Sequence, residues 1–517
     1  MVNMYELANQ FGCKNREIYG CMSENAKNDE NFPKFFVKQI YYGIKTLFLP
    51  QIIFEQMKFV DRENEIKRLR QVLSQEKSSQ FVIIYGRRRL GKSTLIRHVL
   101  ADNDLYFMAD QTEESQQLAL LAKTIGTKIP DFDKVVYPDW ETLIVTLAHR
   151  TPQRFTLCLD EFPYLVKSNP SLPSILQRHI DSKQLPFHLI ICGSSQQMMQ
   201  GLVLDAASPL YGRGDAILKL EPIPIRYLQE ILHTDAVQTV EESAVWGGVP
   251  RYWEIREQAT SLMEAIAYNI IDPNGTLYDE PSRLFLDDFQ HTTQSSTLLS
   301  LIGNGANRLS EIAGRMQKNA TDLSGPLAKL INLGYIERET PFSESPRNSK
   351  RSYYQICDPF MRTYYRYVIP NRSLINLNRK DIVAQTISET FSDFVAAHWE
   401  RLCRNAVSGN QLLGTTWGMA SRWWGTVVIN KEKKNIELDV VAESLDKKKI
   451  LVGECKWTEG EQAGKLFHDL ETKAQGLSFA KDKEIVYALF LKRPATDGVT
   501  DHVFLPQAII DDFKIVI

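Results

Sequence analysis

The feature that most constrains the fold of this chain is a glycine-bounded loop between an apolar run and a helix-forming segment. The run Phe81–Tyr85 is short and continuously apolar, which is typical of a strand buried on both faces of a parallel sheet. The loop Gly86–Ser93 reads Gly-Arg-Arg-Arg-Leu-Gly-Lys-Ser, and we expect a helix at Thr94–Leu100. In that order, the glycines let the loop curl so that its N–H groups and the helix N-terminus face a phosphate. The sequence therefore predicts a phosphate site at the edge of a parallel sheet.

Further apolar runs alternate with helical segments along the first half of the chain. This alternation predicts a doubly wound α/β sheet, because consecutive parallel strands need a crossover segment between them. The expected strands are Leu105–Met108, Phe155–Leu159, Phe187–Cys192 and Ala216–Leu220, and the expected helices include Ile66–Leu73, Leu118–Ile125 and Asp139–His149.

Each part of the glycine-bounded loop has a place in binding a nucleotide. Lys92 would reach the β- and γ-phosphates, and the Ser93 hydroxyl would ligand Mg²⁺. The expected nucleotide-binding residues are Gly86, Arg87, Arg88, Arg89, Leu90, Gly91, Lys92, Ser93 and Thr94. Because pattern and context agree, a chance glycine-rich turn is a poor alternative.

An acidic pair at the end of another expected strand suits the hydrolysis of a nucleoside triphosphate. Asp160 and Glu161 follow the apolar run Phe155–Leu159 directly. Asp160 would hold the metal through water, and Glu161 would polarise the attacking water. The alternative is an ordinary strand end with solvated acids.

Two more residues fit such a site. Ser194 follows the expected strand Phe187–Cys192, so its hydroxyl would lie next to the γ-phosphate, unless it only caps a helix. Arg213 precedes the next strand, where an arginine finger serving a neighbouring subunit would be carried. A homo-oligomer would follow from that role, whereas the alternative for Arg213 is a plain salt bridge within its loop.

The segment from about Phe59 to Tyr252 resembles the archaeal-type ATPase family within the AAA+ and STAND group of P-loop ATPases. The resemblance rests on Phe59-Val-Asp-Arg-Glu-Asn-Glu, the loop Gly86–Ser93, Cys158-Leu-Asp-Glu-Phe, Cys192-Gly-Ser-Ser, Ser208-Pro-Leu-Tyr-Gly-Arg and Trp246-Gly-Gly-Val-Pro. It implies ATP and Mg²⁺ as cofactors, and the preference for ATP over GTP rests mainly on it. It also implies that Pro250, in a helical lid, contacts the adenine base and that a winged helix follows.

A winged helix is also what the pattern of the next segment describes, with three helices and a two-stranded wing. Its strands are expected at Tyr335–Thr340 and Tyr353–Ile356. The expected recognition helix, Asp322–Leu333, offers only Lys329 as a cation, so it is poorly equipped to read base edges. The cations of this segment lie instead in the wing, at Arg347, Lys350 and Arg351. That placement suits phosphate contact, and the alternative role is an internal arm that locks the nucleotide state.

Carboxylates and an amine converge near the C-terminus. The runs Ile436–Ala442 and Leu451–Trp457 are expected to form two strands joined by a lysine-rich hairpin. Glu454 and Lys456 are two residues apart, so they share one face of the second strand, and Asp439 lies at the matching end of the first. Such a group could hold a divalent cation and help a water molecule attack a phosphodiester.

This arrangement resembles the PD-(D/E)XK, restriction-endonuclease-like fold of a domain of uncharacterised function that often follows such ATPases. The resemblance covers about residues 391–480. It implies metal ligands at Asp439 and Glu454, a water-orienting base at Lys456, and an auxiliary ligand at Glu400 in a preceding helix. The residue before Asp439 is not the proline of the literal motif. The alternatives are an exposed hairpin with ordinary surface charges and a nuclease fold that binds but no longer cuts.

The composition excludes several classes of protein. With 43% hydrophobic residues, 24% charged residues and a net charge of −2, the chain is neither disordered nor basic along its whole length. Its seven cysteines form no CxxC pair and have no histidine at zinc spacing. The N-terminal residues lack the apolar core of a signal peptide, and no apolar run approaches the ~18 residues of a membrane span. A cytoplasmic protein without membrane contact is expected.

Changes of pattern divide the chain into five expected segments of an α/β multidomain protein. Residues 1–56 are either an accessory arm or an upstream stretch joined to a true start at Met57. The other segments are a P-loop ATPase core at 57–221, a helical lid at 222–289, a winged helix at 290–371 and a nuclease-like α/β domain at 372–517. Within the last segment, Trp423 and Trp424 are expected to pack in the core rather than stack on bases.

Together these expectations describe an ATP-dependent switch whose nucleotide state controls a metal-dependent nuclease-like domain. Its partners would be ATP, and DNA or RNA through the wing and the C-terminal domain. Two other classes stay open: a non-cutting DNA-binding regulator, and a signalling or assembly ATPase without affinity for nucleic acid. A nuclease assay with and without ATP would separate them.

Overall fold

The computed structural model describes residues 59–151, 153–288, 292–345, 349, 351–429 and 431–513. The expected N-terminal segment 1–56 therefore lies outside the described residues, as do the wing residues Arg347 and Lys350. From Val60 onward the chain forms one compact unit.

A five-stranded parallel sheet in the order β2-β3-β4-β1-β5 organises the first part of the chain. Its strands are β1 (Phe81–Tyr85), β2 (Leu105–Met108), β3 (Thr156–Asp160), β4 (His188–Gly193) and β5 (Ala216–Lys219). The three inner strands are buried along their whole length, as their continuous apolar runs predict. The two edge strands alternate between covered and more exposed residues instead. The predicted doubly wound sheet is thus confirmed, with each strand within one residue of its expected limits.

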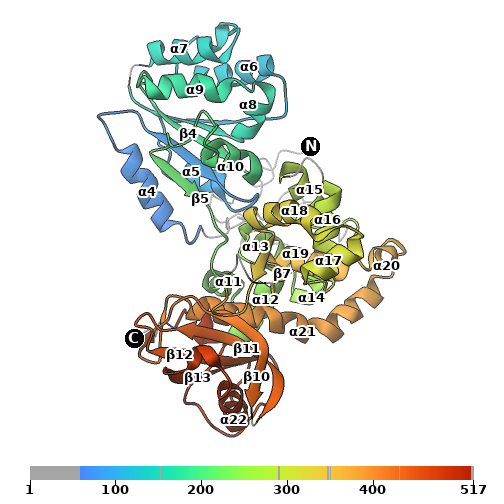
Figure 1. The fold of residues 1–517 in the computed structure, drawn as a ribbon. Helices are drawn as coiled ribbons and strands as arrows, with labels where there is room; N and C mark the ends of the chain where they lie inside the picture. The colour runs from blue at the N-terminus through green and yellow to red at the C-terminus, as the bar shows by residue number, and fades with distance from the viewer. Residues whose placement is uncertain are drawn as a thin grey trace, which may run out of the picture. The chain divides into compact units, whose positions relative to one another are not determined.

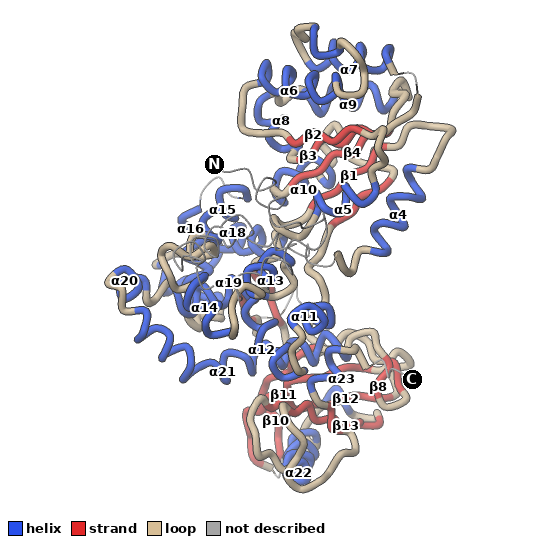
Figure 2. The backbone as a smooth tube through the Cα atoms, turned by 180° about the vertical axis from the view of Figure 1, so that it is seen from behind, coloured by secondary structure: helices blue, strands red, loops and turns tan. Residues whose placement is uncertain are grey.

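Helices cover this sheet on two sides. They are α4 (Glu63–Leu73), α5 (Lys92–Val99), α6 (Glu114–Gly126), η1 (Phe132–Lys134), α7 (Trp140–Arg150), α8 (Phe162–Ser168), α9 (Leu172–Asp181) and α10 (Gln196–Leu204). Figures 1 and 2 show α6, α7, α8 and α9 grouped on one side of the strands, away from α4. Large apolar side chains such as Trp140, Phe162 and Phe187 fill the core between helices and sheet.

A group of helices follows the sheet, in the segment that the sequence assigned to a helical lid. It comprises α11 (Ile225–Leu232), α12 (Ala236–Trp246), α13 (Pro250–Arg256), α14 (Leu262–Asn269) and α15 (Glu280–Asp288). A glycine pair makes the turn between α12 and α13. Gly247 has a left-handed φ of 59°, and a Cβ on Gly248 would fall 2.2 Å from the carbonyl oxygen of Ile223. Only glycine fits a backbone contact that close.

The next segment consists of three helices and a two-stranded antiparallel sheet, and then a long helix. Its elements are α16 (Thr292–Gly303), α17 (Leu309–Met316), α18 (Ala320–Asn332), β6 (Ile336–Glu339), β7 (Tyr353–Ile356), α19 (Pro359–Thr363), the π-helical turn η2 (Tyr364–Val368), α20 (Arg372–Asn376) and α21 (Lys380–Val407). The 28-residue α21 begins at Lys380, before the stretch 391–480 that the nuclease-like resemblance covers. Across the described ranges, neither α21 nor any other helix is both long and apolar enough to cross a membrane.

A second five-stranded sheet, β10-β11-β12-β13-β14, closes the chain and mixes pairing directions. Its strands are β10 (Ser421–Ile429), β11 (Glu432–Glu443), β12 (Lys449–Lys456), β13 (Glu484–Leu491) and β14 (Val503–Phe504). The first three pair antiparallel and the last three parallel. Its other elements are the short strands β8 (Gln411–Leu412) and β9 (Thr415–Thr416), with α22 (Ala463–Ala474), η3 (Ser478–Ala480) and α23 (Pro506–Ile510). The sequence predicted β11 and β12 but not the strands on either side of them.

Candidate functional site

The glycine-bounded loop curls around its own lysine. Gly91 takes a left-handed φ of 84° immediately before α5, and a Cβ on Gly86 would lie 2.7 Å from the carbonyl oxygen of Leu220. The Nζ atom of Lys92 donates to the carbonyl oxygens of Gly86 at 2.9 Å and Arg87 at 3.0 Å. The lysine is 6% exposed. Its amine is therefore held within the loop, where phosphate oxygens would compete for its hydrogen bonds.

Asp160 lies at the carboxyl end of β3 and joins the loop through hydroxyl groups. Its Oδ2 atom accepts hydrogen bonds from Ser93 Oγ at 2.6 Å and from the Tyr106 hydroxyl at 2.5 Å. Burial and then the charge of Asp160 raise the pKa of Tyr106, so the phenol stays a donor. Tyr106 was not predicted from the sequence, although it stands on β2, the strand beside β3.

Glu161 and Ser194 meet across β3 and β4, which are neighbours in the sheet. Ser194 Oγ donates to the Glu161 carboxylate, with distances of 2.8 Å and 3.0 Å to its two oxygens, and the Ser194 N–H lies 3.2 Å from Oε2. Glu161 holds a left-handed φ of 52°, which costs a residue with a Cβ about 1–2 kcal/mol. The conformation turns its carboxylate to the serine rather than along the following helix.

The arginines of the loop bind carboxylates from far along the chain. Arg87 forms an ion pair with Asp358, the residue that caps α19, and Arg89 pairs with Glu280 at 2.8 Å. Tyr252 bridges the two pairs, since its hydroxyl lies 3.4 Å from an Arg87 nitrogen and 3.3 Å from a Glu280 oxygen. All four charged side chains are largely buried, Glu280 at 1% exposed. The sequence placed the arginines at the nucleotide but gave no sign of their partners.

Arg213 and Pro250 are two further residues that the sequence assigned to the nucleotide site. Arg213 forms a two-bond ion pair with Asp181, with nitrogen–oxygen distances of 2.8 Å and 3.0 Å. Asp181 is the last residue of α9, so this salt bridge reaches outside the loop of Arg213. Pro250 is buried in the first turn of α13, the helix that carries Tyr252.

The C-terminal carboxylates are close together on β11, β12 and α21, and cations surround them. Glu454 is bound by both Lys456 and Lys473 at 2.8 Å, and Asp439 accepts a hydrogen bond from the Cys455 N–H at 2.8 Å. Burial, followed by the charges of Glu400 and Glu454, raises the pKa of Asp439 to about 7.

This cluster differs from a preformed metal site. Over the ranges that the structure describes, no three side chains among His, Cys, Asp and Glu are arranged to hold a metal ion. Glu400 lies 3.7 Å from Arg404, and both oxygens of Glu454 are bound by lysines. Lys473, on α22, was not among the residues that the sequence singled out. Cation binding by Asp439 and Glu454 would therefore require at least one lysine to move away.

A basic, aromatic groove lies where β7 meets β10. Its volume is about 910 Å³, and its lining includes Arg308, Arg351, Tyr353, Arg422 and Trp424. Tyr353 and Trp424 pack edge to face at 5.0 Å, with the Arg422 guanidinium over both rings. Thus, of the two neighbouring tryptophans, Trp423 is buried as expected, whereas Trp424 lines the groove.

Two family models match the chain. Residues 59–244 match the model described as an ATPase domain predominantly from Archaea, and residues 364–467 match one described as archaeal and bacterial proteins of unknown function. An uncharacterized protein of Methanocaldococcus jannaschii is 30% identical over 446 residues, which cover 84% of this chain and 96% of that protein.

Solved structures with a similar arrangement include the Walker-type ATPase of Pyrococcus abyssi. It is 19% identical, with a TM-score of 0.46, and the match covers 60% of this chain and 96% of that one. The ORC2 protein of Aeropyrum pernix in ADPNP and ADP complexes is 14% identical, with a TM-score of 0.39, over 64% of this chain and 95% of that one.

Proposed function

This chain belongs to the archaeal ATPase family with a C-terminal domain of unknown function, and on that premise we propose an ATP-hydrolysing switch. The nucleotide state of its loop would control the C-terminal domain. One observation carries the proposal: the glycine-bounded loop that holds Lys92 is hydrogen-bonded through Ser93 to Asp160, the residue before Glu161. Lysine, aspartate and glutamate in such positions bind phosphate, hold a metal ion and orient water.

Each residue of the loop would have its own part in holding the nucleotide. Lys92 exchanges the carbonyl oxygens of Gly86 and Arg87 for phosphate oxygens, and the loop N–H groups cradle the phosphates. Ser93 and Asp160 would hold Mg²⁺, which when bound neutralises the phosphate charge. Their mutual hydrogen bond already places both oxygens on one side of the loop.

Glu161 would orient the attacking water, and Ser194 would position Glu161. Both carboxylate oxygens of Glu161 are within 3.0 Å of Ser194 Oγ, so the serine fixes the direction of the carboxylate until a water or a γ-phosphate replaces one contact. In a homo-oligomer, Arg213 would leave Asp181 and reach the nucleotide of a neighbouring subunit. Pro250 would cover the adenine base.

The ion pairs of Arg87 and Arg89 offer the means of coupling. If the loop moves when it binds phosphate, Asp358 and Glu280 must move with it, or their ion pairs with Arg87 and Arg89 must break. Breaking a buried ion pair costs about 3–5 kcal/mol when a charge is left unpaired, so the loop and its partners would move together. This fits the proposed division into core (57–221), lid (222–289), winged helix (290–371) and C-terminal domain (372–517).

For the C-terminal domain we propose phosphodiester recognition, with cutting as the first candidate. Asp439 and Glu454 would hold a divalent cation, Glu400 would assist, and Lys456 would orient water. The groove with Tyr353 and Trp424 would bind the DNA or RNA strand, because aromatic rings beside arginines suit bases next to phosphates. The lysines on Glu454 favour the second candidate, a switch that binds nucleic acid without cutting it.

The ATPase proposal is tested by Glu161→Gln in the full chain. We expect this variant to bind ATP as tightly as the unchanged chain and to release phosphate about 10²-fold more slowly, since a general base contributes about that much. Glu114→Gln, in α6, is a carboxylate control that should hydrolyse ATP at the normal rate. Phosphate release by Glu161→Gln at the normal rate would refute the role of this residue.

The C-terminal proposal needs a separate assay. Labelled DNA and RNA are incubated with Mg²⁺ or Mn²⁺, with and without ATP, and with Asp439→Ala as the matched variant. Cutting that is lost in Asp439→Ala supports the nuclease. Salt-sensitive binding without cutting supports the non-cutting switch. An absence of both leaves only the signalling ATPase among the three classes.

A further inference from the structure

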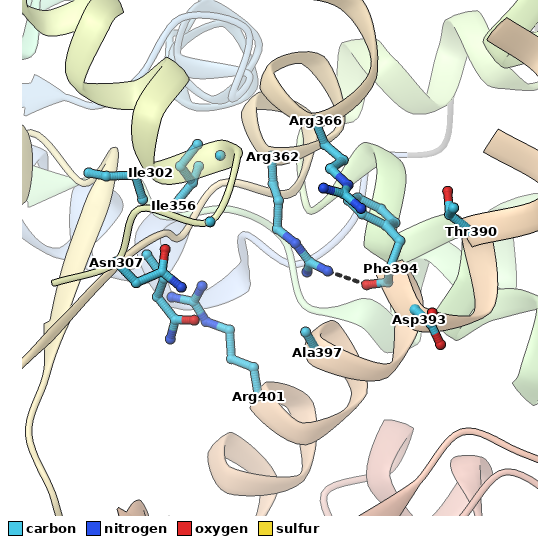
Figure 3. Close-up of a pocket in the computed structure, with 13 residues that line it drawn as sticks. Ile302, Asn307, Ile356, Arg362, Arg366, Thr390, Asp393, Phe394, Ala397 and Arg401 are labelled. Atoms are coloured by element: carbon cyan, nitrogen blue, oxygen red, sulfur yellow. Dashed lines mark hydrogen bonds between the residues drawn. The ribbon is translucent and has the colours of Figure 1, made fainter. Parts of the chain in front are cut away.

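A small basic cavity lies apart from both sites, where α19, η2 and α21 meet β7 and the loop after α16. It has a volume of about 260 Å³ and is lined by Arg362, Arg366 and Arg401, with Asp393 as the one carboxylate among its lining residues. Figure 3 shows Arg362 and Arg401 entering this space from α19 and α21. Three guanidinium groups around so small a volume call for an explanation, because like charges repel.

Of the three arginines, Arg362 gives the clearest evidence for a bound anion. Its guanidinium donates to the carbonyl oxygen of Phe394 and lies 4.2 Å from the centre of that phenyl ring. Of the carboxylates that the structure describes, none lies within ion-pair distance of it. Burial, and then the charge of Arg401, lower the pKa of Arg362 to about 10. A half-buried guanidinium without an ion-pair partner is destabilising, and a bound anion would relieve that cost.

The other two arginines, Arg401 and Arg366, differ in whether the protein already pairs their charge. Arg401 pairs with Glu337 at 2.7 Å and donates to the Cys357 carbonyl oxygen at 3.2 Å, yet its charge still acts on Arg362. Arg366 is exposed at the rim, and among the described residues it too has no carboxylate within ion-pair distance. Arg362 and Arg366 are therefore the two lining cations without an ion-pair partner among the described residues, against the one carboxylate of Asp393.

We propose that this cavity binds a small phosphate-bearing dianion, either inorganic phosphate or a phosphomonoester with a compact organic part. Guanidinium groups match phosphate oxygens with paired N–H donors, and the arginines of the lining outnumber its one carboxylate. The cavity is small, since pockets for drug-sized molecules begin at about 300 Å³.

Helix α19 connects this cavity to the nucleotide loop. Asp358 caps the start of α19 and pairs with Arg87, while Arg362 stands one turn later on the same helix. A shift of α19 on anion binding would thus reach Arg87. This second step rests on the proposed nucleotide site, and linkage makes it reciprocal, since each ligand changes the affinity of the other by the same factor.

The test measures binding of inorganic phosphate and of ribose 5-phosphate to the full chain by calorimetry, with ribose as the uncharged control. The nucleotide loop also attracts phosphate, so every titration uses the Lys92→Ala background. We expect one site for each phosphate compound and none for ribose. Arg362→Met should weaken binding at least tenfold, Arg366→Gln several-fold, and Arg315→Gln, an exposed arginine of α17, not at all. Arg366→Gln lies at the surface, so it keeps the test valid if Arg362→Met does not fold.

Each result of these titrations either supports or overturns the proposal. Binding of both compounds points to a phosphate ion as the minimal ligand, and binding of ribose 5-phosphate alone points to a phosphomonoester. An absence of binding, or binding that neither Arg362→Met nor Arg366→Gln weakens, overturns the proposal. An oligonucleotide that binds through Arg362 when neither small compound does also overturns it, in favour of a nucleic acid backbone. Because Lys92→Ala removes the nucleotide site beforehand, these results do not depend on the proposed ATPase activity.

Discussion

The two sheets of this protein hold their candidate carboxylates in opposite ways. In the parallel sheet, Asp160 and Glu161 accept hydrogen bonds from the hydroxyls of Ser93, Tyr106 and Ser194. In the mixed sheet, Glu454 is bound by two lysines. A hydroxyl can rotate and exchange its partner for a metal ion or water at little cost, whereas a lysine compensates a charge and must be replaced by another cation. The first site is thus ready for its ligand, and the second is closed.

The largest expected effect comes from removing the lysine of the glycine-bounded loop. Lys92→Ala should weaken ATP binding more than 10²-fold, because a charge-assisted contact to phosphate is lost inside the loop. The fold should persist, since within the described part of the chain Lys92 bonds to carbonyl oxygens of its own loop. Binding of a fluorescent ATP analogue measures the effect, with Lys123→Ala, an exposed lysine of α6, as control. Unchanged affinity for the ATP analogue would show that Lys92 does not bind its phosphates.

The two carboxylates themselves give a sharper contrast. Glu454→Gln should lower the free energy of unfolding by roughly 1–2 kcal/mol, because it leaves Lys456 and Lys473 without their partner. Asp160→Asn should lower it by less, since Ser93 and Tyr106 can turn toward the remaining amide oxygen. Urea denaturation measures both. If both variants lose the same free energy of unfolding, then lysine partners and hydroxyl partners do not differ in how strongly they hold a carboxylate.

Opening the closed site is the next test of the comparison. Lys473→Met should free one oxygen of Glu454 and tighten Mn²⁺ binding by several-fold. Lys465→Met, an exposed lysine on the same helix, provides the matched control. Titration calorimetry with Mn²⁺ in the absence of nucleotide measures the change. If Lys473→Met and Lys465→Met bind Mn²⁺ alike, then Lys473 is not what keeps the cation out.

The smallest effect concerns the contact between α12 and α21. His398 is buried, and its Nε2 lies 3.0 Å from Ser243 Oγ. Burial, and then the charges of Arg362 and Arg401, hold the pKa of His398 well below 6.5. Below pH 6.5 the unfolded chain therefore takes up a proton that the folded chain refuses. This contribution to stability is complete above pH 6.5 and falls by up to about 1.4 kcal/mol per pH unit below it.

The variant His398→Gln should remove that loss on the acid side. Its free energy of unfolding, compared with that of the unchanged chain between pH 7.5 and pH 5.5, should fall less steeply. His149→Gln, a histidine in α7, serves as the control and should keep the original slope. A parallel fall in His398→Gln and the unchanged chain would show that this histidine is protonated in the fold.

The same contrast explains what the sequence could predict. The strands β1 to β5 and the cluster at their ends follow from short contiguous motifs, because the fold brings the carboxyl ends of parallel strands together. In the mixed sheet only β11 and β12 could be predicted. Strands β10 and β13 contain interrupted patterns, with Gly425 in the first and a polar start in the second. Their place in the sheet is decided by tertiary pairing.

The missed residues share one property, which is distance along the chain. Asp358 is 271 residues from Arg87, and Lys473 is 19 residues from Glu454 on a different element. No local pattern marks such partners, because a carboxylate or a lysine on a helix is most often a solvated surface charge. The sequence thus located the candidate residues, whereas the structure was needed to show what binds them.

The pairing of Arg87 with Asp358 has a practical consequence for dissecting this protein. A recombinant fragment that stops after the lid, at residue 289, would retain the whole nucleotide motif and lose the partner of one loop arginine. Its ATP affinity would then reflect an added free positive charge beside the phosphates as well as the motif itself. Fragments meant to report on the intact loop should extend beyond α19, so that the arginine keeps its native neighbour.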